Sequence, residues 1–213
     1  MRGLFITFEG GEGAGKSTQS RRLKSALEEL GRDVVLTREP GGTPEAEKIR
    51  DLLVQRDGGN WTPMAECLLF FAARQMHVET LIKPAIANGK IVICDRFTDS
   101  TIAYQGYGHG FDIPTIREVE KLTLGGFKPD LTFILDLPVS EGLQRSLKQK
   151  VTATGKENTE DRFEKLQSNF HEKLRQGFLD IASQDTKRCI VVDARQSADD
   201  VYHSIWERIK NAL

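Results

Sequence analysis

The segment from Gly10 to Ser17, which reads Gly-Gly-Glu-Gly-Ala-Gly-Lys-Ser, constrains the fold of this chain more than any other sequence feature. It satisfies the pattern G-x-x-x-x-G-K-[ST], whose glycines let backbone N–H groups turn inward around phosphate oxygens. In that pattern Lys16 reaches the β- and γ-phosphates, and the hydroxyl group of Ser17 holds Mg²⁺. The apolar run Leu4–Glu9 precedes the segment and a helical pattern follows it, so the positive end of a helix faces the same anion. The sequence therefore predicts that the chain binds a nucleoside triphosphate.

Short apolar runs alternate with helical patterns along the rest of the chain. All but the first run are nearly continuous in apolar residues, which is typical of strands that are buried on both faces of a parallel sheet. The runs are Leu4–Glu9, Val34–Thr37, Ile91–Asp95, Leu131–Leu137 and Cys189–Asp193. Together with the intervening helices they predict a three-layer α/β fold of the phosphate-loop NTPase type, with a five-stranded, mostly parallel sheet. We expect residues 1–213 to form a single domain of this kind.

Composition excludes several other classes of protein. The chain has 30 basic and 31 acidic residues, whereas proteins that bind nucleic acids non-specifically usually carry a basic excess. The longest uninterrupted apolar run, Cys67–Ala73, is far shorter than the roughly 20 residues that a membrane-spanning helix needs. The N-terminus shows no apolar leader, and the cysteines show no metal-ligand or disulfide spacing. We therefore expect a cytoplasmic protein that binds small ligands, with no nucleic-acid or membrane partner.

GTP-dependent switch proteins also carry a phosphate-binding loop, but this sequence lacks two further motifs of that class. An Asn-Lys-x-Asp motif that reads the guanine base is absent, and so is the Asp-x-x-Gly switch motif. The chain is also too short to carry a mechanical domain beside a nucleotide-binding fold. These features favour a phosphotransferase that acts on a small molecule.

Asp95 and Arg96 close the third apolar run and form a second group of candidate site residues. A carboxylate at the carboxyl end of a parallel strand faces the ligand crevice, where Asp95 could hold Mg²⁺ directly or through water. The planar guanidinium group of Arg96 can bind phosphate oxygens in pairs and so bridge two phosphate groups. A surface ion pair is the alternative interpretation of Asp-Arg, but a strand end that follows a phosphate-binding loop favours the functional one.

Several longer motifs resemble those of the bacterial thymidylate kinases in residue type, order and spacing. They are Phe8-Glu9-Gly10, Thr37-Arg38-Glu39-Pro40-Gly41-Gly42-Thr43, Phe70-Phe71-Ala72-Ala73-Arg74, Asp95-Arg96-Phe97, Ala103-Tyr104-Gln105-Gly106 and Pro129-Asp130-Leu131-Thr132. The resemblance covers essentially the whole chain. It implies ATP-dependent phosphorylation of dTMP to dTDP with Mg²⁺, by a cytoplasmic enzyme that is typically a homodimer. The alternatives are another nucleotide or nucleoside kinase of the same fold, or a switch protein that binds ATP and hydrolyses it slowly.

The resemblance also implies roles for individual residues. Phe70 stacks on the thymine base, Arg74 hydrogen-bonds the edge of the base, and Tyr104 excludes a 2′-hydroxyl group. The implied ATP site is Gly10, Gly11, Glu12, Gly13, Ala14, Gly15, Lys16, Ser17 and Thr18, and the implied dTMP site is Glu39, Arg50, Phe70, Arg74, Arg96, Thr101, Tyr104 and Gln105. The implied catalytic residues are Lys16, Arg96, Glu12 and Arg162, and the metal ligands are Ser17 and Asp95. Without the resemblance, Phe70 would be interpreted as a core residue and Arg74 as part of a surface ion pair.

The segment from about residue 146 to residue 162 departs from the strand–helix pattern and predicts a lid. Its central part, Lys148–Glu160, combines lysines, threonines and a glycine, which favours a long surface loop. The resemblance implies that an arginine of the lid contacts the transferred phosphoryl group, with Arg162 as the first candidate and Arg145 as the second. The lysines of the segment, Lys148, Lys150 and Lys156, cannot make the same bidentate contact.

We expect no role in the reaction for the four histidines. They fall in helical or loop positions without evident partners, at residues His77, His109, His171 and His203. The acceptor in the implied reaction is already an ionised phosphate, and phosphoryl transfer depends on positioning and charge neutralisation more than on a strong base.

Overall fold

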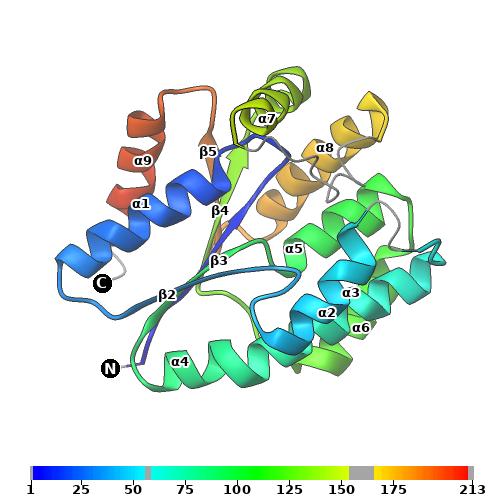
Figure 1. Cartoon of the computed structure of the whole chain (residues 1–213), viewed down its shortest axis with the longest axis horizontal. Helices are drawn as coiled ribbons and strands as arrows, with labels where there is room; N and C mark the ends of the chain where they lie inside the picture. Colours follow the sequence, from blue (N-terminus) through cyan, green and yellow to red (C-terminus); the bar gives the residue numbers. More distant parts are fainter. Residues whose placement is uncertain (1, 56–58, 154–165, 211–213) are drawn as a thin grey trace.

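One sheet runs through the middle of the molecule, with helices packed against both of its faces (Figure 1). The computed structural model describes residues 2–55, 59–153 and 166–210. The strands are β1 (Phe5–Glu9), β2 (Val34–Arg38), β3 (Ile91–Asp95), β4 (Leu131–Asp136) and β5 (Cys189–Asp193). They form a five-stranded sheet in the order β2-β3-β1-β4-β5, and every neighbouring pair is parallel. The predicted α/β fold with a parallel sheet is confirmed.

Helices cover the two faces of the sheet with two separate apolar cores. They are α1 (Lys16–Glu29), α2 (Pro44–Val54), α3 (Pro63–His77), α4 (Lys83–Ala87), α5 (Thr98–Thr101), α6 (Ile113–Leu124), α7 (Val139–Ala153), α8 (Ser168–Gln184) and α9 (Ala198–Lys210), with the π-helical segments η1 (Val78–Ile82) and η2 (Ile102–Gly108). On one face Leu23 of α1 and Ile205 of α9 belong to the same buried cluster as Ile6 of β1. On the other face Phe71 of α3 clusters with Phe5. Successive residues of β1 therefore supply opposite cores, as the alternation of a strand requires.

The order of the strands determines where a ligand can bind. β2 and β3 lie on one side of β1, whereas β4 and β5 lie on the other, so the direction of winding reverses at β1. Open α/β sheets bind ligands in the crevice outside the carboxyl ends of the strands at such a reversal. The candidate loop that begins at Gly10 follows β1, and Arg96 follows β3, which places both at this crevice.

Capping contacts explain where two of the helices begin. The hydroxyl group of Thr62 accepts a hydrogen bond from the backbone N–H of Ala65, and α3 begins at Pro63, whose ring suits the first helical position. The hydroxyl group of Ser197 accepts from the N–H of Asp200 at 3.2 Å, at the start of α9. The first of these caps sets the register of α3, which carries several residues of the site.

The expectation that each continuous apolar run is buried on both faces is wrong for the two edge strands. Every residue of β2 is at least partly accessible, and Val191 of β5 is 46% exposed. Both strands pair with a neighbour on one side only and lie at the borders of the sheet, where the flanking helices cover them less completely than the central strands.

The predicted loop that begins at Lys148 is also wrong at its start. Helix α7 continues to Ala153, because no glycine or proline occurs between Lys148 and Gly155 and the lysines and glutamine of this stretch are good helix formers. Residues 154–165, which include Lys156 and Arg162, lie outside the described residues, as does the side chain of Lys150. In the part of the chain that the structure describes, no helix has the length and apolar character needed to cross a bilayer.

Candidate active site

The segment from Gly10 to Gly15 forms a tight loop in which the backbone geometry favours glycine at several positions. Gly13 has a φ of +66°, and a Cβ atom there would lie 2.1 Å from the carbonyl oxygen of Gly142 in α7. Gly15 has a φ of +94° and precedes α1 without a side-chain cap. The first N–H groups of α1 are therefore left to face an anion at the positive end of the helix.

Lys16, the first residue of α1, is buried and folded back onto the loop. Its Nζ atom donates to the carbonyl oxygens of Gly10 at 3.0 Å and Gly11 at 2.8 Å. Burial and the neighbouring charge of Arg96 lower the pKa of Lys16, while nearby carboxylates oppose that effect. The ammonium group thus lies over the loop that would hold the phosphates.

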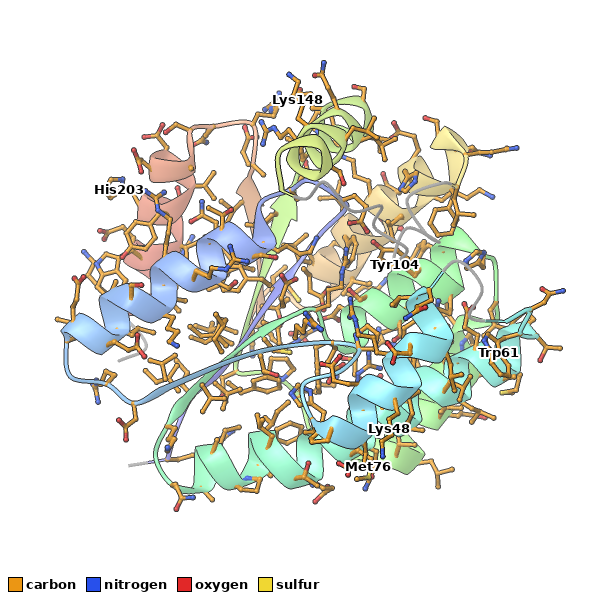
Figure 2. All side chains as sticks on the ribbon, viewed as in Figure 1. Lys48, Trp61, Met76, Tyr104, Lys148 and His203 are labelled. Carbon is orange, nitrogen blue, oxygen red and sulfur yellow. The ribbon has the colours of Figure 1, made fainter. Side chains whose placement is uncertain are left out.

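Glu12 places a negative charge inside this loop, and two side chains compensate it. Arg96 donates from Nη2 to Oε1 of Glu12 at 2.9 Å, and the hydroxyl group of Tyr104 donates to the same oxygen at 2.6 Å. Burial alone would raise the pKa of Glu12, but the charges of Arg96 and Lys16 outweigh it and lower the pKa to about 2. Burial raises the pKa of Tyr104 well above its ordinary value, so the phenol keeps its proton and remains a donor. Tyr104 belongs to η2 and is labelled in Figure 2.

Arg96 occupies an unusual backbone conformation at the centre of the crevice. Its φ of +72° makes it the only non-glycine residue with a left-handed backbone among the residues described. Its guanidinium group also donates to the carbonyl oxygen of Gly10 at 3.2 Å and lies 5.0 Å from the ring centre of Tyr104. Such strain is concentrated at functional sites, where surrounding contacts maintain it. Arg96 thereby connects the phosphate-binding loop with Tyr104 of η2.

Two oxygen ligands suited to Mg²⁺ lie beside the loop. The hydroxyl group of Ser17 donates to Oδ2 of Asp95 at 2.6 Å, which joins the start of α1 to the end of β3. Hydroxyl and carboxylate oxygens are the ligands that this cation prefers, usually alongside phosphate oxygens of the nucleotide. The pair fits a magnesium ion that is shared with a bound triphosphate.

A cavity of about 340 Å³ opens next to these residues and extends toward α2, α3 and η2. It is lined by Glu12, Ser17, Arg38, Glu39, Pro40, Arg50, Val54, Phe70, Arg74, Asp95, Arg96, Phe97, Ser100, Thr101, Tyr104 and Gln105. The structure therefore brings together every residue of the predicted dTMP site, and both predicted metal ligands, around one space.

Two residues that line this cavity, Arg74 and Gln105, are each fixed by a carboxylate. Arg74 donates from Nε to Glu39 at 2.6 Å, and from Nη2 to the hydroxyl group of Thr101 at 3.0 Å. Gln105 donates from Nε2 to Glu66 at 3.0 Å, which fixes the orientation of its amide because a carboxylate only accepts. The Nη1 atom of Arg74 and the Oε1 atom of Gln105 have no hydrogen-bond partner among the described residues, although both are buried.

Other predicted residues lie at the walls of the same cavity. Phe70 is 8% exposed and packs with Leu53 of α2 while it lines the cavity, so it is both a core residue and a wall of the site. Arg50 donates to the carbonyl oxygen of Pro40 at 2.7 Å. Arg145, the second lid candidate, instead donates to the carbonyl oxygen of Ala194 at 2.9 Å, and Lys148 is exposed on α7.

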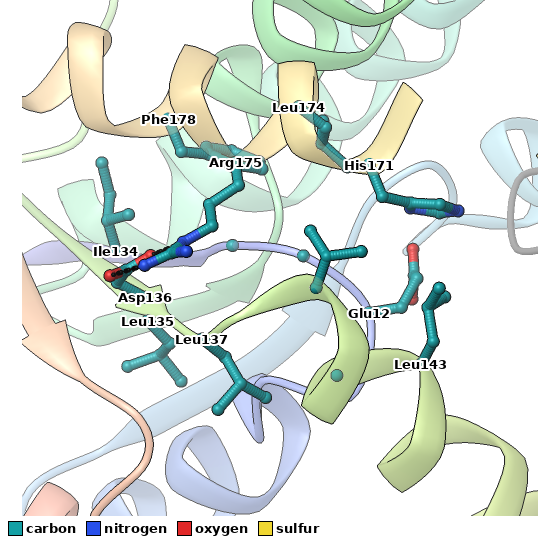
Figure 3. A pocket seen from close by; sticks show the side chains of 14 residues that line it. Glu12, Ile134, Leu135, Asp136, Leu137, Leu143, His171, Leu174, Arg175 and Phe178 are labelled. Atoms are coloured by element: carbon teal, nitrogen blue, oxygen red, sulfur yellow. Dashed lines mark hydrogen bonds and ion pairs between the residues drawn. The ribbon is translucent and has the colours of Figure 1, made fainter. Parts of the chain in front are cut away.

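A second, much smaller cavity lies between the loop and α8 (Figure 3). Its volume of about 20 Å³ holds no more than about one water molecule. Arg175 closes one end through two contacts with Asp136, at 2.7 and 2.9 Å. This space is too small for a nucleotide.

The sequence did not identify two buried residues that support the site. Glu66 holds Gln105, and His77 contacts both Glu39 and Thr37, so the prediction that the histidines lack partners is wrong for His77. Both lie on α3 with Phe70 and Arg74, at spacings of four, four and three residues, and therefore on one helical face. Ionisable residues on the buried face of a helix are the signal that could have revealed them.

Comparison with known proteins gives one family. The family model described as thymidylate kinase matches residues 8–205. A thymidylate kinase of Caulobacter vibrioides is 50% identical over 212 residues, which cover 100% of this chain and 98% of that protein. One from Syntrophotalea carbinolica is 48% identical over 210 residues, covering 99% of this chain and 96% of that protein. The crystal structure of a thymidylate kinase from Ehrlichia chaffeensis matches with a TM-score of 0.76 at 37% identity, over 98% of this chain and 99% of that one.

Proposed function

The chain belongs to the thymidylate kinase family and phosphorylates dTMP to dTDP, and we propose the roles that its own residues have in this reaction. The γ-phosphoryl group of ATP passes to a phosphate oxygen of dTMP, which leaves ADP. The loop that follows β1 holds the donor, and the 340 Å³ cavity holds the acceptor.

The observation that carries the acceptor assignment is a pair of buried, unpartnered polar atoms on two residues that line the cavity. Arg74 offers a donor at Nη1 and Gln105 an acceptor at Oε1, both buried and without a partner within the described ranges. Thymine presents the complementary pair on one edge, the O4 acceptor beside the N3–H donor. Cytosine presents an amino donor beside an N3 acceptor, so it would leave both protein atoms unsatisfied. Phe70 supplies an aromatic wall on which the base can stack.

On the donor side, backbone N–H groups of the loop and the ammonium group of Lys16 bind the phosphates of ATP. Lys16 exchanges its contacts with the carbonyl oxygens of Gly10 and Gly11 for phosphate oxygens. Ser17 and Asp95 would hold Mg²⁺, which neutralises phosphate charge when bound. The residues that bind the triphosphate therefore lie either in one continuous segment or at the end of β3, the strand beside β1 in the sheet.

Transfer itself requires a cation between the two phosphates, and Arg96 lies where they meet. It contacts the loop at Gly10 and Glu12, and it lines the acceptor cavity. Its planar guanidinium group can bind both phosphate groups and stabilise the charge that develops between them. The acceptor is already ionised, so Glu12 acts by fixing Arg96 and Tyr104 instead of removing a proton.

Three further features remain part of this proposal. Arg162 is the candidate from the lid, and the enzyme acts in the cytoplasm as a homodimer. The exposed apolar residues Leu52 of α2 with Met64 and Leu68 of α3 support the dimer, because such residues on neighbouring helices favour a protein interface. Sedimentation of Leu68→Glu at half the mass of the unaltered protein would support this surface, and an unaltered protein that sediments as a monomer would contradict it.

Coupled ADP release with dTMP, dUMP and dCMP tests the acceptor assignment. We expect dTMP and dUMP to be phosphorylated, because they share the imide edge, and dCMP to have a kcat/KM at least about 100-fold lower. Equal rates with dCMP would contradict the proposed contacts of Arg74 and Gln105. ADP release that is independent of any monophosphate would instead support the switch-protein alternative.

A further inference from the structure

His77 is a completely buried histidine at the end of α3 that the proposed reaction does not use. Both of its ring nitrogens have partners. Nδ1 lies 2.9 Å from Oε1 of Glu39, and Nε2 lies 2.7 Å from the hydroxyl oxygen of Thr37. Since the carboxylate of Glu39 is an acceptor, Nδ1 carries a proton and donates it, and in the neutral imidazole Nε2 then accepts the hydroxyl proton of Thr37.

The same carboxylate continues the chain of contacts into the acceptor cavity. Its other oxygen, Oε2, accepts from Nε of Arg74 at 2.6 Å. Arg74 then donates from Nη2 to the carbonyl oxygen of Phe97 and the hydroxyl group of Thr101, and its buried Nη1 has no hydrogen-bond partner among the described residues. Each oxygen of Glu39 thus has a separate partner, so rotation of the carboxylate would break one of two buried contacts.

The backbone of the turn after β2 passes close to the side chains of His77 and Thr37. Gly42 lies in the turn after β2, and a Cβ atom at this position would be 2.5 Å from both Nε2 of His77 and the hydroxyl oxygen of Thr37. The turn therefore packs directly against the outer end of the chain of contacts. This close approach, together with a φ of +91°, explains a glycine at this position of the Glu-Pro-Gly-Gly motif.

A metal site is the other arrangement these side chains could form. Ligand atoms of Glu39, His77 and Cys94 all lie within 4.8 Å of one another. However, both ring nitrogens of His77 are used in hydrogen bonds, and the thiol of Cys94 donates to the carbonyl oxygen of Arg96 at 3.0 Å. A cation placed here would also lie beside the guanidinium group of Arg74, so the contacts favour a hydrogen-bonded chain.

We propose that His77, supported by Thr37, is a positioning residue for recognition of the acceptor base. It holds Glu39 so that Glu39 fixes the plane of the Arg74 guanidinium group and directs Nη1 into the cavity. This inference rests on the proposed function of Arg74. If Arg74 does not read the base, the unaltered enzyme will fail to prefer dTMP over dCMP. If His77 does not position Arg74, the unaltered enzyme will behave as expected and only the His77 variants will depart from the expected kinetics.

Three substitutions of His77 separate positioning from packing. His77→Phe removes both contacts, and we expect the KM for dTMP to rise about tenfold or more while the KM for ATP changes less than about twofold. His77→Asn can restore a donor near Nδ1 and should recover most of the loss. His77→Gln places its amide nearer the position that Nε2 occupies in histidine, so it should not restore the KM for dTMP. The fully buried Ile205→Ala, in the core on the opposite face of the sheet, is the control for lost stability alone.

The decisive comparison repeats His77→Phe in a protein that already carries Arg74→Gln. If His77 acts through Arg74, its tenfold effect on the KM for dTMP should largely disappear in that background. An equal loss in both backgrounds, or a parallel rise in the KM for ATP, would overturn the proposal and make His77 a packing residue. If His77→Phe does not fold, the near-isosteric Thr37→Val provides the test. We then expect a two- to threefold rise in the KM for dTMP that is absent beside Arg74→Gln, and an unchanged KM would overturn the proposal.

Discussion

The two halves of the crevice hold their charged groups in different ways. On the donor side, Lys16 is held by carbonyl oxygens of its own loop, at Gly10 and Gly11. On the acceptor side, Arg74 is held by Glu39, 35 residues away in sequence, and Gln105 by Glu66, 39 residues away. The donor half is thus built mainly from one local segment, which Asp95 and Arg96 complete from the end of β3, whereas the acceptor half is assembled from several distant elements.

This difference corresponds to what each half must recognise. A phosphate group can be bound by repeated backbone N–H groups, which require only a loop of suitable shape. A base requires a donor and an acceptor at fixed positions, and side chains keep such positions only when other side chains hold them. We therefore expect substitutions to affect the two substrates separately, except at residues that contact both halves.

Arg96 is such a residue, and replacing it should produce the largest effect. It contacts Gly10 and Glu12 on the donor side and lines the acceptor cavity. We expect Arg96→Ala to lower kcat about 10³-fold or more, in keeping with arginines that stabilise a transferring phosphoryl group, and to raise the KM for dTMP. Steady-state kinetics measure both parameters. Arg96→Lys, which keeps the charge but loses the paired contacts, should be intermediate, and near-normal kcat in either variant would contradict the role of Arg96.

Arg74→Gln should affect the acceptor half alone. Loss of a buried, charge-assisted hydrogen bond to the base corresponds to roughly 1–3 kcal/mol, or about a 10- to 100-fold fall in kcat/KM for dTMP. The preference for dTMP over dCMP should fall with it, while the KM for ATP stays within about twofold. Kinetics with both acceptors test this, and a variant that retains the full preference would remove Arg74 from base recognition.

Tyr104→Phe should give a smaller effect, because it removes one hydroxyl group while the ring remains. Glu12 then keeps Arg96 but loses the contact from Tyr104 at 2.6 Å. We expect kcat to fall by about 3- to 30-fold. Smaller residues at position 104 should in addition raise kcat/KM for the ribonucleotide analogue relative to dTMP, and an unchanged ratio would mean that the 2′ position is read elsewhere.

Glu9→Gln should change stability and its pH dependence. Burial, with the nearby charge of Asp99, raises the pKa of Glu9 from 4.5 to about 8. Between these values the folded protein keeps a proton that the unfolded chain has lost, so Glu9 makes stability fall as the pH rises from about 4.5 to about 8 and adds no further loss above that. Glutamine can reproduce the contacts of the protonated acid with Phe97 and Ser100.

Urea unfolding of both proteins from pH 5 to pH 9 measures this effect. The stability advantage of Glu9→Gln should grow through that window by up to about 1.4 kcal/mol per pH unit and then level off. An advantage that is the same at every pH would mean that Glu9 is ionised throughout.

The donor half could be predicted from the sequence more completely than the acceptor half. The physical reason is again that its residues lie close together in the chain. The loop, the strand that precedes it and the helix that follows it are local, so the motif at residues 10–17 and the apolar patterns on either side of it identified them. Asp95 and Arg96 were identifiable because carboxyl ends of parallel strands meet at one edge. The edge strands were misjudged because an apolar run does not show its place in the sheet, which depends on pairing with distant segments.

Support for the acceptor half could not be predicted in this way. Glu66 and His77 act through Gln105 and Glu39, and which side chains meet depends on how α3 packs against β2 and η2. A buried histidine is recognisable from sequence only when the packing of its helix is known. The resemblance to a family identified residues that line the cavity, but it did not reveal the buried residues that hold them.

Separate calorimetric titrations of Phe70→Ala with dTMP and with ATP test the independence of the two halves most directly. Phe70 lines the acceptor cavity and packs with Leu53 of α2. The account predicts that dTMP binds about 10- to 100-fold more weakly, as expected for loss of a stacking surface, while ATP affinity stays within about twofold. Unchanged dTMP affinity, or an equal loss for both ligands, would contradict it.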